Sequence, residues 1–215
     1  DILLRKAINY AIDREKMMKF LRKNIGYPAV SGLVPNGLNN DFYSDRYFKN
    51  TELANKYLDE YKKINDIDNI SLDLTTDAQY LDILEFIQSE LKSLGIDLKI
   101  NITPPSILRQ GKATGKFNIF RASWIADYAN PENYFSLFYS KNHTPYGPNY
   151  TFFQNEEYDK LYEQTLSLNK KDELNKIYQK LEEIINEFSP IIPLYYDMSV
   201  RLKQKNIFGL MNNPL

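Results

Sequence analysis

The sequence predicts an α/β domain with a mixed β-sheet and flanking helices. Residues 70–76 and 96–102 alternate apolar and polar side chains, which is typical of strands. Between them, residues 81–94 carry Leu and Ile at helical spacing, and Gly95 follows where a helix would end. A strand, a helix and a strand within roughly 30 residues form a βαβ unit, which implies parallel strands. A chain of 215 residues is long enough for a self-supporting core.

The composition is that of an ordinary globular protein and excludes several partners. With 27 basic and 28 acidic side chains, the net charge of −1 favours neither nucleic acid nor an anionic membrane as a partner. The absence of cysteine excludes disulfides, thiolate metal sites and a cysteine nucleophile. No apolar run approaches the ~20 residues that a membrane helix needs. The 17 Tyr and 12 Phe would suit a wet binding surface, although an A- and T-rich genome is the simpler explanation.

The N-terminal part of the chain predicts helices separated by a loop. Residues 1–24 place apolar side chains at helical spacing, and Asp13 is positioned to cap a second helix. Residues 26–40 contain two Pro and three Gly and predict a loop. Residues 51–61 predict a helix with one apolar side.

The C-terminal part predicts two more strands and several helices. Pro104 and Pro105 open a helix, and residues 117–124 alternate as a strand would. A turn at residues 127–131 and a loop at 141–151 follow, and then Asn155 begins a helix. The cleanest apolar stripe of the chain predicts a core-facing helix over residues 174–188. Residues 190–196 predict a last strand.

No residue pattern points to catalysis, a metal or a cofactor. The single histidine, His143, has no second His or Cys with which to hold zinc, so we expect a surface residue. Neither a nucleophile elbow nor a glycine-rich phosphate loop is present. The acidic pairs at 156–157 and 182–183 are interpreted as solvated helix faces. The sequence therefore predicts a protein that is not an enzyme.

The strongest candidate for a site is the end of the 117–124 strand. The only tryptophan, Trp124, is followed three residues later by Asp127 and then by Tyr128. Ligands of α/β sheets usually bind at strand ends, and a carboxylate in partly dry surroundings would attract an ammonium group. The alternative is that Asp127 accepts backbone N–H groups in the turn before Pro131. The residues alone leave both open.

The same stretch carries a resemblance to a known family. Residues 124–132, Trp-Ile-Ala-Asp-Tyr-Ala-Asn-Pro-Glu, resemble the Trp-x-x-Asp-Tyr-x-x-Pro signature of the family-5 extracellular solute-binding proteins. Residues 4–15, 32–35, 155–161 and 190–196 resemble other segments of that family, in the family's order. One departure is Asn36, which stands where a second Pro is common. The resemblance covers nearly the whole chain.

The resemblance implies that residues 1–215 are a single ligand-binding C-terminal lobe, cut from a longer chain with a two-lobed periplasmic-binding-protein-like fold. Such a protein would be a monomer that captures peptides for an ABC importer, without chemistry on the ligand. Its partners would be the importer's permease subunits and the missing N-terminal lobe. Its location would be extracytoplasmic, either in the periplasm or lipid-anchored as a lipoprotein. Some relatives of this fold carry nickel complexes, haem or sugars.

The resemblance also implies roles for individual residues. Asp127 would pair with the α-amino group of a bound peptide, next to Tyr128. Ser123, Trp124 and Ile125 would offer backbone groups to the ligand, in the manner of strand addition. Two further hypotheses remain: an aromatic-rich carbohydrate-binding or glycosidase module, and an interaction domain without a ligand. Calorimetry with peptides and with oligosaccharides would discriminate between the ligand classes.

Overall fold

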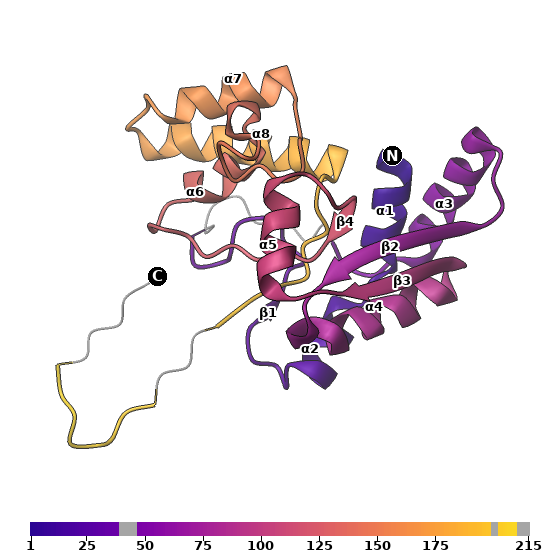
Figure 1. Ribbon diagram of the computed structural model, residues 1–215. Coiled ribbons are helices and arrows are strands. Elements are labelled where there is room, and N and C mark those ends of the chain that lie inside the picture. The colour runs from indigo at the N-terminus through magenta and orange to yellow at the C-terminus, as the bar shows by residue number, and fades with distance from the viewer. Residues whose placement is uncertain (39–46, 199–201, 210–215) are drawn as a thin grey trace.

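The computed structural model describes residues 1–38, 47–198 and 202–209 (Figure 1). Its central sheet has three parallel strands in the order β3-β2-β4. β2 (Ile70–Thr76) and β3 (Ile96–Ile102) pair along their whole length, and β4 (Ile119–Phe120) pairs with the other side of β2. The helix α4 (Leu81–Ser93) connects β2 to β3. The predicted βαβ unit is therefore confirmed.

The N-terminal helices cover one face of this sheet. They are α1 (Ile2–Ala11), α2 (Arg14–Leu21) and α3 (Thr51–Asn65), and together with α4 they form one hydrophobic core with β2 and β3. The Asp13 side chain accepts the Lys16 N–H at 2.8 Å, so the predicted helix cap is confirmed. The helix α5 (Pro105–Ala113) crosses the side of the sheet that faces the viewer in Figure 1.

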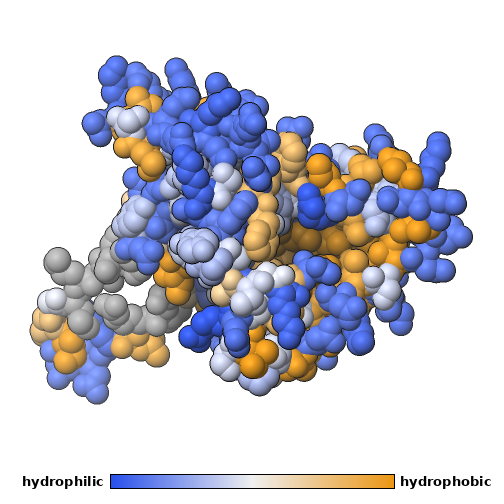
Figure 2. All heavy atoms as spheres, turned by 45° about the horizontal axis from the view of Figure 1, so that its top comes forward, coloured by the Kyte–Doolittle hydropathy of each residue, from blue (hydrophilic) through white to orange (hydrophobic). Residues whose placement is uncertain are grey.

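A second, aromatic core holds the C-terminal helices together. These are α6 (Glu132–Phe135), α7 (Glu156–Thr165) and α8 (Lys171–Phe188), and the 3₁₀ turn η2 (Ser136–Phe138) follows α6. Phe135 stacks on Tyr178 with ring centroids 5.3 Å apart. The apolar stripe predicted for the last helix lies in this core. In Figure 2 the molecule is hollowed between the half that carries α7 and α8 and the half that carries the sheet, with hydrophobic side chains at the base.

The antiparallel pairing belongs to a separate two-stranded sheet. β1 (Tyr27–Pro28) pairs with β5 (Tyr195–Tyr196). The parallel and antiparallel pairings that were predicted for one mixed sheet therefore lie in two separate sheets. The predicted 26–40 loop thus contains a short strand, and its positions 39 and 40 lie outside the described residues. The strand predicted at 190–196 is reduced to its last two residues, because Pro190 and Pro193 cannot donate to a ladder.

Arg14 joins distant parts of the chain from a fully buried position. Its side chain donates to the backbone oxygens of Asn9 at 2.9 Å, Tyr47 at 2.6 Å and Pro193 at 2.6 Å. Arg14 is only 1% exposed, and burial lowers the pKa of its guanidinium to about 10. The group therefore stays charged at neutral pH. It ties α1 and α2 to the segment that leads into β5.

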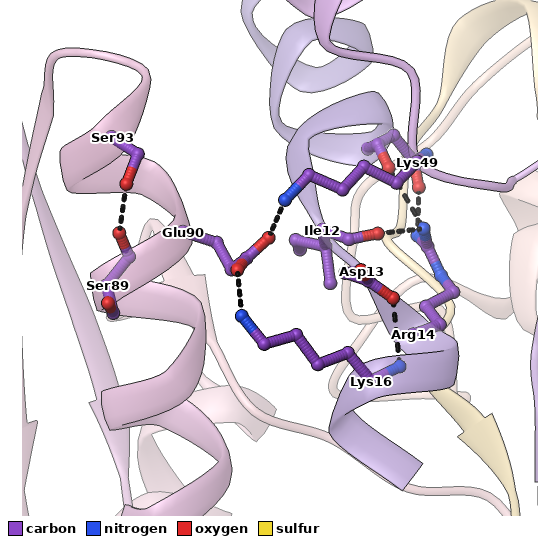
Figure 3. Close-up of polar contacts among 9 residues, drawn as sticks. Ile12, Asp13, Arg14, Lys16, Lys49, Ser89, Glu90 and Ser93 are labelled. Carbon is purple, nitrogen blue, oxygen red and sulfur yellow. Dashed lines mark hydrogen bonds and ion pairs between the residues drawn. The ribbon is translucent and has the colours of Figure 1, made fainter. Parts of the chain in front are cut away.

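An acidic side chain on α4 connects this helix to the N-terminal part (Figure 3). The Glu90 carboxylate lies 2.5 Å from the Lys49 ammonium and 3.7 Å from the Lys16 ammonium. The Glu90 side chain is only 9% exposed, whereas both lysines are partly in water. The pairs hold α4 against α2 and against the residues just before α3.

One member of the predicted acidic pairs is not solvated, whereas its neighbour Glu183 is exposed as predicted. Glu156 and its neighbour at 157 are exposed, but Glu182 is fully buried and accepts the Leu33 N–H at 2.8 Å. Glu182 lies four residues after Tyr178 and three before Ile185, and both of these are buried in the aromatic core. Helical spacing therefore places it on the apolar face.

Candidate functional site

The carboxyl ends of the parallel strands meet at one edge of the sheet. A hollow of 380 Å³ lies there, lined by residues 77–79, directly after β2, and by residues 102–105 at the end of β3. β4 ends at the same edge, because it runs parallel to β2. This is the place where α/β sheets usually bind ligands.

The strand predicted over residues 117–124 is much shorter in the structure. Only Ile119 and Phe120 pair with β2, and the Arg121 N–H adds one more bond, 3.1 Å to the Thr75 oxygen. The ladder stops because β2 itself ends at Thr76. The chain then continues beyond the sheet edge through all five predicted site residues.

The backbone after the ladder is unpaired within the described part of the chain. The N–H and C=O groups of Ser123, Trp124 and Ile125 have no hydrogen-bond partner among residues 1–38, 47–198 and 202–209. Ser123 is exposed and Ile125 is 81% exposed, whereas Trp124 is partly buried. Unpaired backbone groups at a sheet edge can accept a further strand.

Asp127 lies at the far end of this segment and is exposed to solvent. No described residue donates a hydrogen bond to its carboxylate or forms an ion pair with it. The turn is capped instead by Asn130, whose Oδ1 accepts the Glu132 N–H at 2.9 Å. The structure thus contradicts the alternative in which the Asp127 carboxylate serves the turn.

Asn133 is a residue that the sequence reasoning missed. Its Oδ1 accepts the Trp124 indole N–H at 2.7 Å and the Asp127 backbone N–H at 3.4 Å. It therefore brings together two of the predicted residues. The sequence feature that could have identified Asn133 is its position two residues after Pro131, at the start of a possible helix next to the segment.

Tyr128 belongs to a cluster of phenols around one carboxylate. Its hydroxyl and that of Tyr162 donate to the two oxygens of Glu132. The hydrogen bond to Glu132 is the main reason why the pKa of Tyr128 is raised, followed by burial, while a hydrogen bond with Asn133 acts in the opposite direction. Burial is the main reason for the raised pKa of Tyr162. The cluster anchors Tyr128 to α6 and α7.

Positively charged side chains lie near the start of the segment, around Arg121, and the sequence analysis did not assign them to the site. The Arg121 guanidinium lies 3.2 Å from the centroid of the Tyr80 ring and donates to the Ser123 hydroxyl at 3.4 Å. Burial, and then the charges of Arg121 and Arg109, lower the pKa of Lys112. The edge thus carries a free carboxylate and a group of cations.

The described residues contain no group of three or more His, Asp or Glu side chains that could hold a metal ion. His143 is partly exposed, and one of its ring nitrogens lies 3.0 Å from the Phe153 oxygen. A further cavity of 320 Å³ lies between α1, α3 and α8, and none of the five predicted site residues lines it. None of the described helices has both the length and the hydrophobicity to cross a membrane.

Comparisons with known proteins give the chain relatives along its whole length. The model of a family described as bacterial extracellular solute-binding proteins, family 5 Middle, matches residues 1–146. The dipeptide-binding protein DppE of Bacillus subtilis (strain 168) is 29% identical over 224 residues, which cover 99% of this chain and 40% of DppE.

Solved structures share the fold. The oligopeptide-binding protein AppA of Bacillus subtilis, in complex with a nonapeptide, matches with a TM-score of 0.78 at 25% identity, over 92% of this chain and 42% of AppA. A peptide-binding protein of a peptide ABC transporter matches with a TM-score of 0.77 at 24% identity, over 92% of both chains. The chain therefore spans about two fifths of the length of DppE and AppA.

Proposed function

Because the chain belongs to the family 5 bacterial extracellular solute-binding proteins, we propose that residues 1–215 are the C-terminal lobe of a two-lobed protein that captures peptides for an ABC importer. The names of its relatives DppE and AppA support a peptide as the ligand class. The coverage of about 40% of DppE supports a second lobe that these residues do not include.

The observation that carries the proposal is the unpaired backbone of Ser123, Trp124 and Ile125 beside the free carboxylate of Asp127. A peptide offers backbone N–H and C=O groups in alternation, so it can satisfy such a segment as an added strand. Its α-amino group would then pair with Asp127. Tyr128, held by Glu132, would border the same end of the ligand.

The cations at the sheet edge fit the opposite charge of a peptide. Arg121 and Lys112 lie next to the strand end, and Arg121 already contacts Ser123 in the proposed ligand-binding segment. A carboxylate would gain a charge-assisted hydrogen bond there. The site would thus hold a zwitterionic ligand with its ammonium group at Asp127 and its negative charge toward Arg121.

Closure of two lobes would convert this open edge into a buried site without any reaction on the ligand. In this proposal the protein is a monomer, and the importer's permease subunits receive the peptide. Family membership supports a location outside the cytoplasm. Within the proposal, that location is the periplasm or, for a lipoprotein, the outer face of the cell membrane.

The carbohydrate-binding or glycosidase hypothesis loses its main support. It rested on the abundance of aromatic side chains, and many of these are used to build the core around α7 and α8. Three of them, Phe135, Phe138 and Tyr158, are at most 1% exposed and so are out of reach of a sugar.

Calorimetry tests the proposal. We expect the two-lobed protein to bind short peptides with free termini and to give no heat with oligosaccharides. The 215-residue chain alone should bind the same peptides at least about 100-fold more weakly, because half of the burying surface is absent. Submicromolar peptide binding by this chain alone would contradict the two-lobe proposal, and saccharide binding would contradict the ligand class.

A further inference from the structure

One buried side chain, Asn133, connects two residues of the predicted site. Asn133 is 4% exposed, and its Oδ1 lies 2.7 Å from the Trp124 indole nitrogen and 3.4 Å from the Asp127 backbone nitrogen. An amide oxygen has two lone pairs, so it can accept from both donors at once. One atom therefore sets the distance between the indole and the backbone that bears the Asp127 carboxylate.

Asn133 is itself fixed by the surrounding structure. Its backbone N–H donates to the Asn130 oxygen at 3.1 Å, and its backbone oxygen accepts the Ser136 hydroxyl at 2.8 Å. Two residues later, Phe135 is fully buried in the aromatic core and stacks on Tyr178. The amide is thus attached to a rigid part of the fold, whereas Ser123, Trp124 and Ile125 have no backbone hydrogen-bond partner in the described chain.

The two donors differ in what they would do without Asn133. A partly buried indole N–H needs an acceptor, so loss of the Asn133 oxygen would favour a different orientation of the Trp124 ring. The Asp127 N–H could turn to water, because Asp127 is exposed. Without the amide oxygen, the segment between residues 124 and 127 would lose both of its side-chain anchors.

We propose that Asn133 is a positioning residue for the ligand site: its amide oxygen holds the Trp124 ring and the Asp127 backbone in the arrangement that meets the ligand. This inference rests on the proposed function, since it assigns the geometry of that same site. A site held in advance loses less freedom on binding than one that must be ordered by the ligand.

The single tryptophan makes the anchoring directly measurable. In the 215-residue chain the indole N–H gives one ¹⁵N–¹H signal, and we expect its exchange with water to be at least about tenfold slower than in a short tryptophan peptide. Asn133→Leu should remove this protection and shift the tryptophan emission to the red. Asn133→Asp keeps an acceptor oxygen and should retain both properties.

Asn149→Leu is the matched control. Asn149 is also buried, and its amide donates to the Tyr139 and Phe153 oxygens, away from the segment. Its replacement should lower stability and leave the indole signal unchanged. Unprotected exchange of the Trp124 indole N–H with water in the unsubstituted chain would by itself overturn the inference. Fast exchange of this N–H in a folded Asn133→Asp variant would also overturn it.

The link to binding is tested in the two-lobed protein. We expect Asn133→Leu to weaken peptide binding about tenfold or more, and Asn133→Asp to stay within a few-fold of the unsubstituted protein. Unchanged affinity in an Asn133→Leu variant whose indole signal has moved would overturn the positioning role. Absence of peptide binding by the unsubstituted protein would instead be a failure of the proposed function.

Discussion

Replacement of Asp127 by Asn removes one charge and keeps the size of the side chain. The carboxylate is exposed and has no partner among the described residues, so the substitution should not unfold the chain. A pair of unit charges about 4 Å apart interacts by ~1 kcal/mol in water and by ~4 kcal/mol at an effective dielectric constant of 20. The first value applies to the exposed carboxylate of this chain, and the second applies to a site closed by the proposed second lobe.

We therefore expect Asp127→Asn in the two-lobed protein to weaken the binding of a free peptide by ~2–4 kcal/mol, roughly 30-fold or more in Kd. Calorimetry with a peptide and with its N-acetylated form measures the effect. The acetylated peptide should bind the unsubstituted protein weakly and should be nearly indifferent to the substitution. Asp59→Asn, on the exposed side of α3, is the control for net charge.

The result that would refute this reasoning is equal affinity of the free and the acetylated peptide for the unsubstituted protein. In that case Asp127 would not bind the amino group, whatever the affinity of the variant. A variant with lowered thermal stability would instead mean that the carboxylate has a structural partner.

Three further predictions concern stability and are read as midpoints of urea unfolding of the 215-residue chain. Arg14→Leu should lower the free energy of unfolding by about 3–5 kcal/mol, because three buried or partly buried backbone oxygens lose their donor. An unchanged midpoint would contradict this account. Gly32→Ala should also be destabilising, because the φ of Gly32 is +139° and a Cβ there would lie 2.3 Å from a Glu182 oxygen. Gly37→Ala is the control and should be neutral, because a Cβ at Gly37 would meet no atom within 4 Å. Burial and nearby negative charge raise the pKa of Tyr178 from 10.0 to about 12. Between pH 10 and pH 12 the folded state therefore holds more protons than the unfolded state. The free energy of unfolding should fall as the pH rises through this range. In Tyr178→Phe the fall should be smaller, and an equal fall would assign the effect to other groups.

Much of the fold could be predicted because its signals are local. β2 and β3 have the predicted bounds, since alternation of side chains along a strand requires no knowledge of its neighbours. The helices α1, α2 and α8 were predicted from apolar spacing and, for α2, from the cap at Asp13. Where a pattern was overlooked, as at Glu182, the spacing from its buried neighbours contained the information.

The length of β4 could not be predicted, because it depends on another strand. Its alternating pattern continues to Trp124, but the ladder can extend only as far as β2 provides partners. The same limit applies to the site. Its five predicted positions lie within residues 123–128, whereas the contact that brings Trp124 and Asp127 together comes from Asn133, whose position in space the sequence does not give.

The end of the ladder is what leaves the proposed binding edge available. At Thr76 the chain turns into η1 (Ala78–Tyr80), where the Asp77 side chain accepts the Gln79 N–H at 3.0 Å. β2 therefore offers no backbone groups beyond this point. A β2 longer by a few residues would pair with the segment after Arg121 and occupy the groups that a peptide needs. Backbone groups in contact with water gain little free energy from pairing within the chain, so in this proposal they remain available to a ligand that excludes the water. In the proposed site, then, binding follows from where β2 stops, and Asp127 determines which end of a peptide lies next to it.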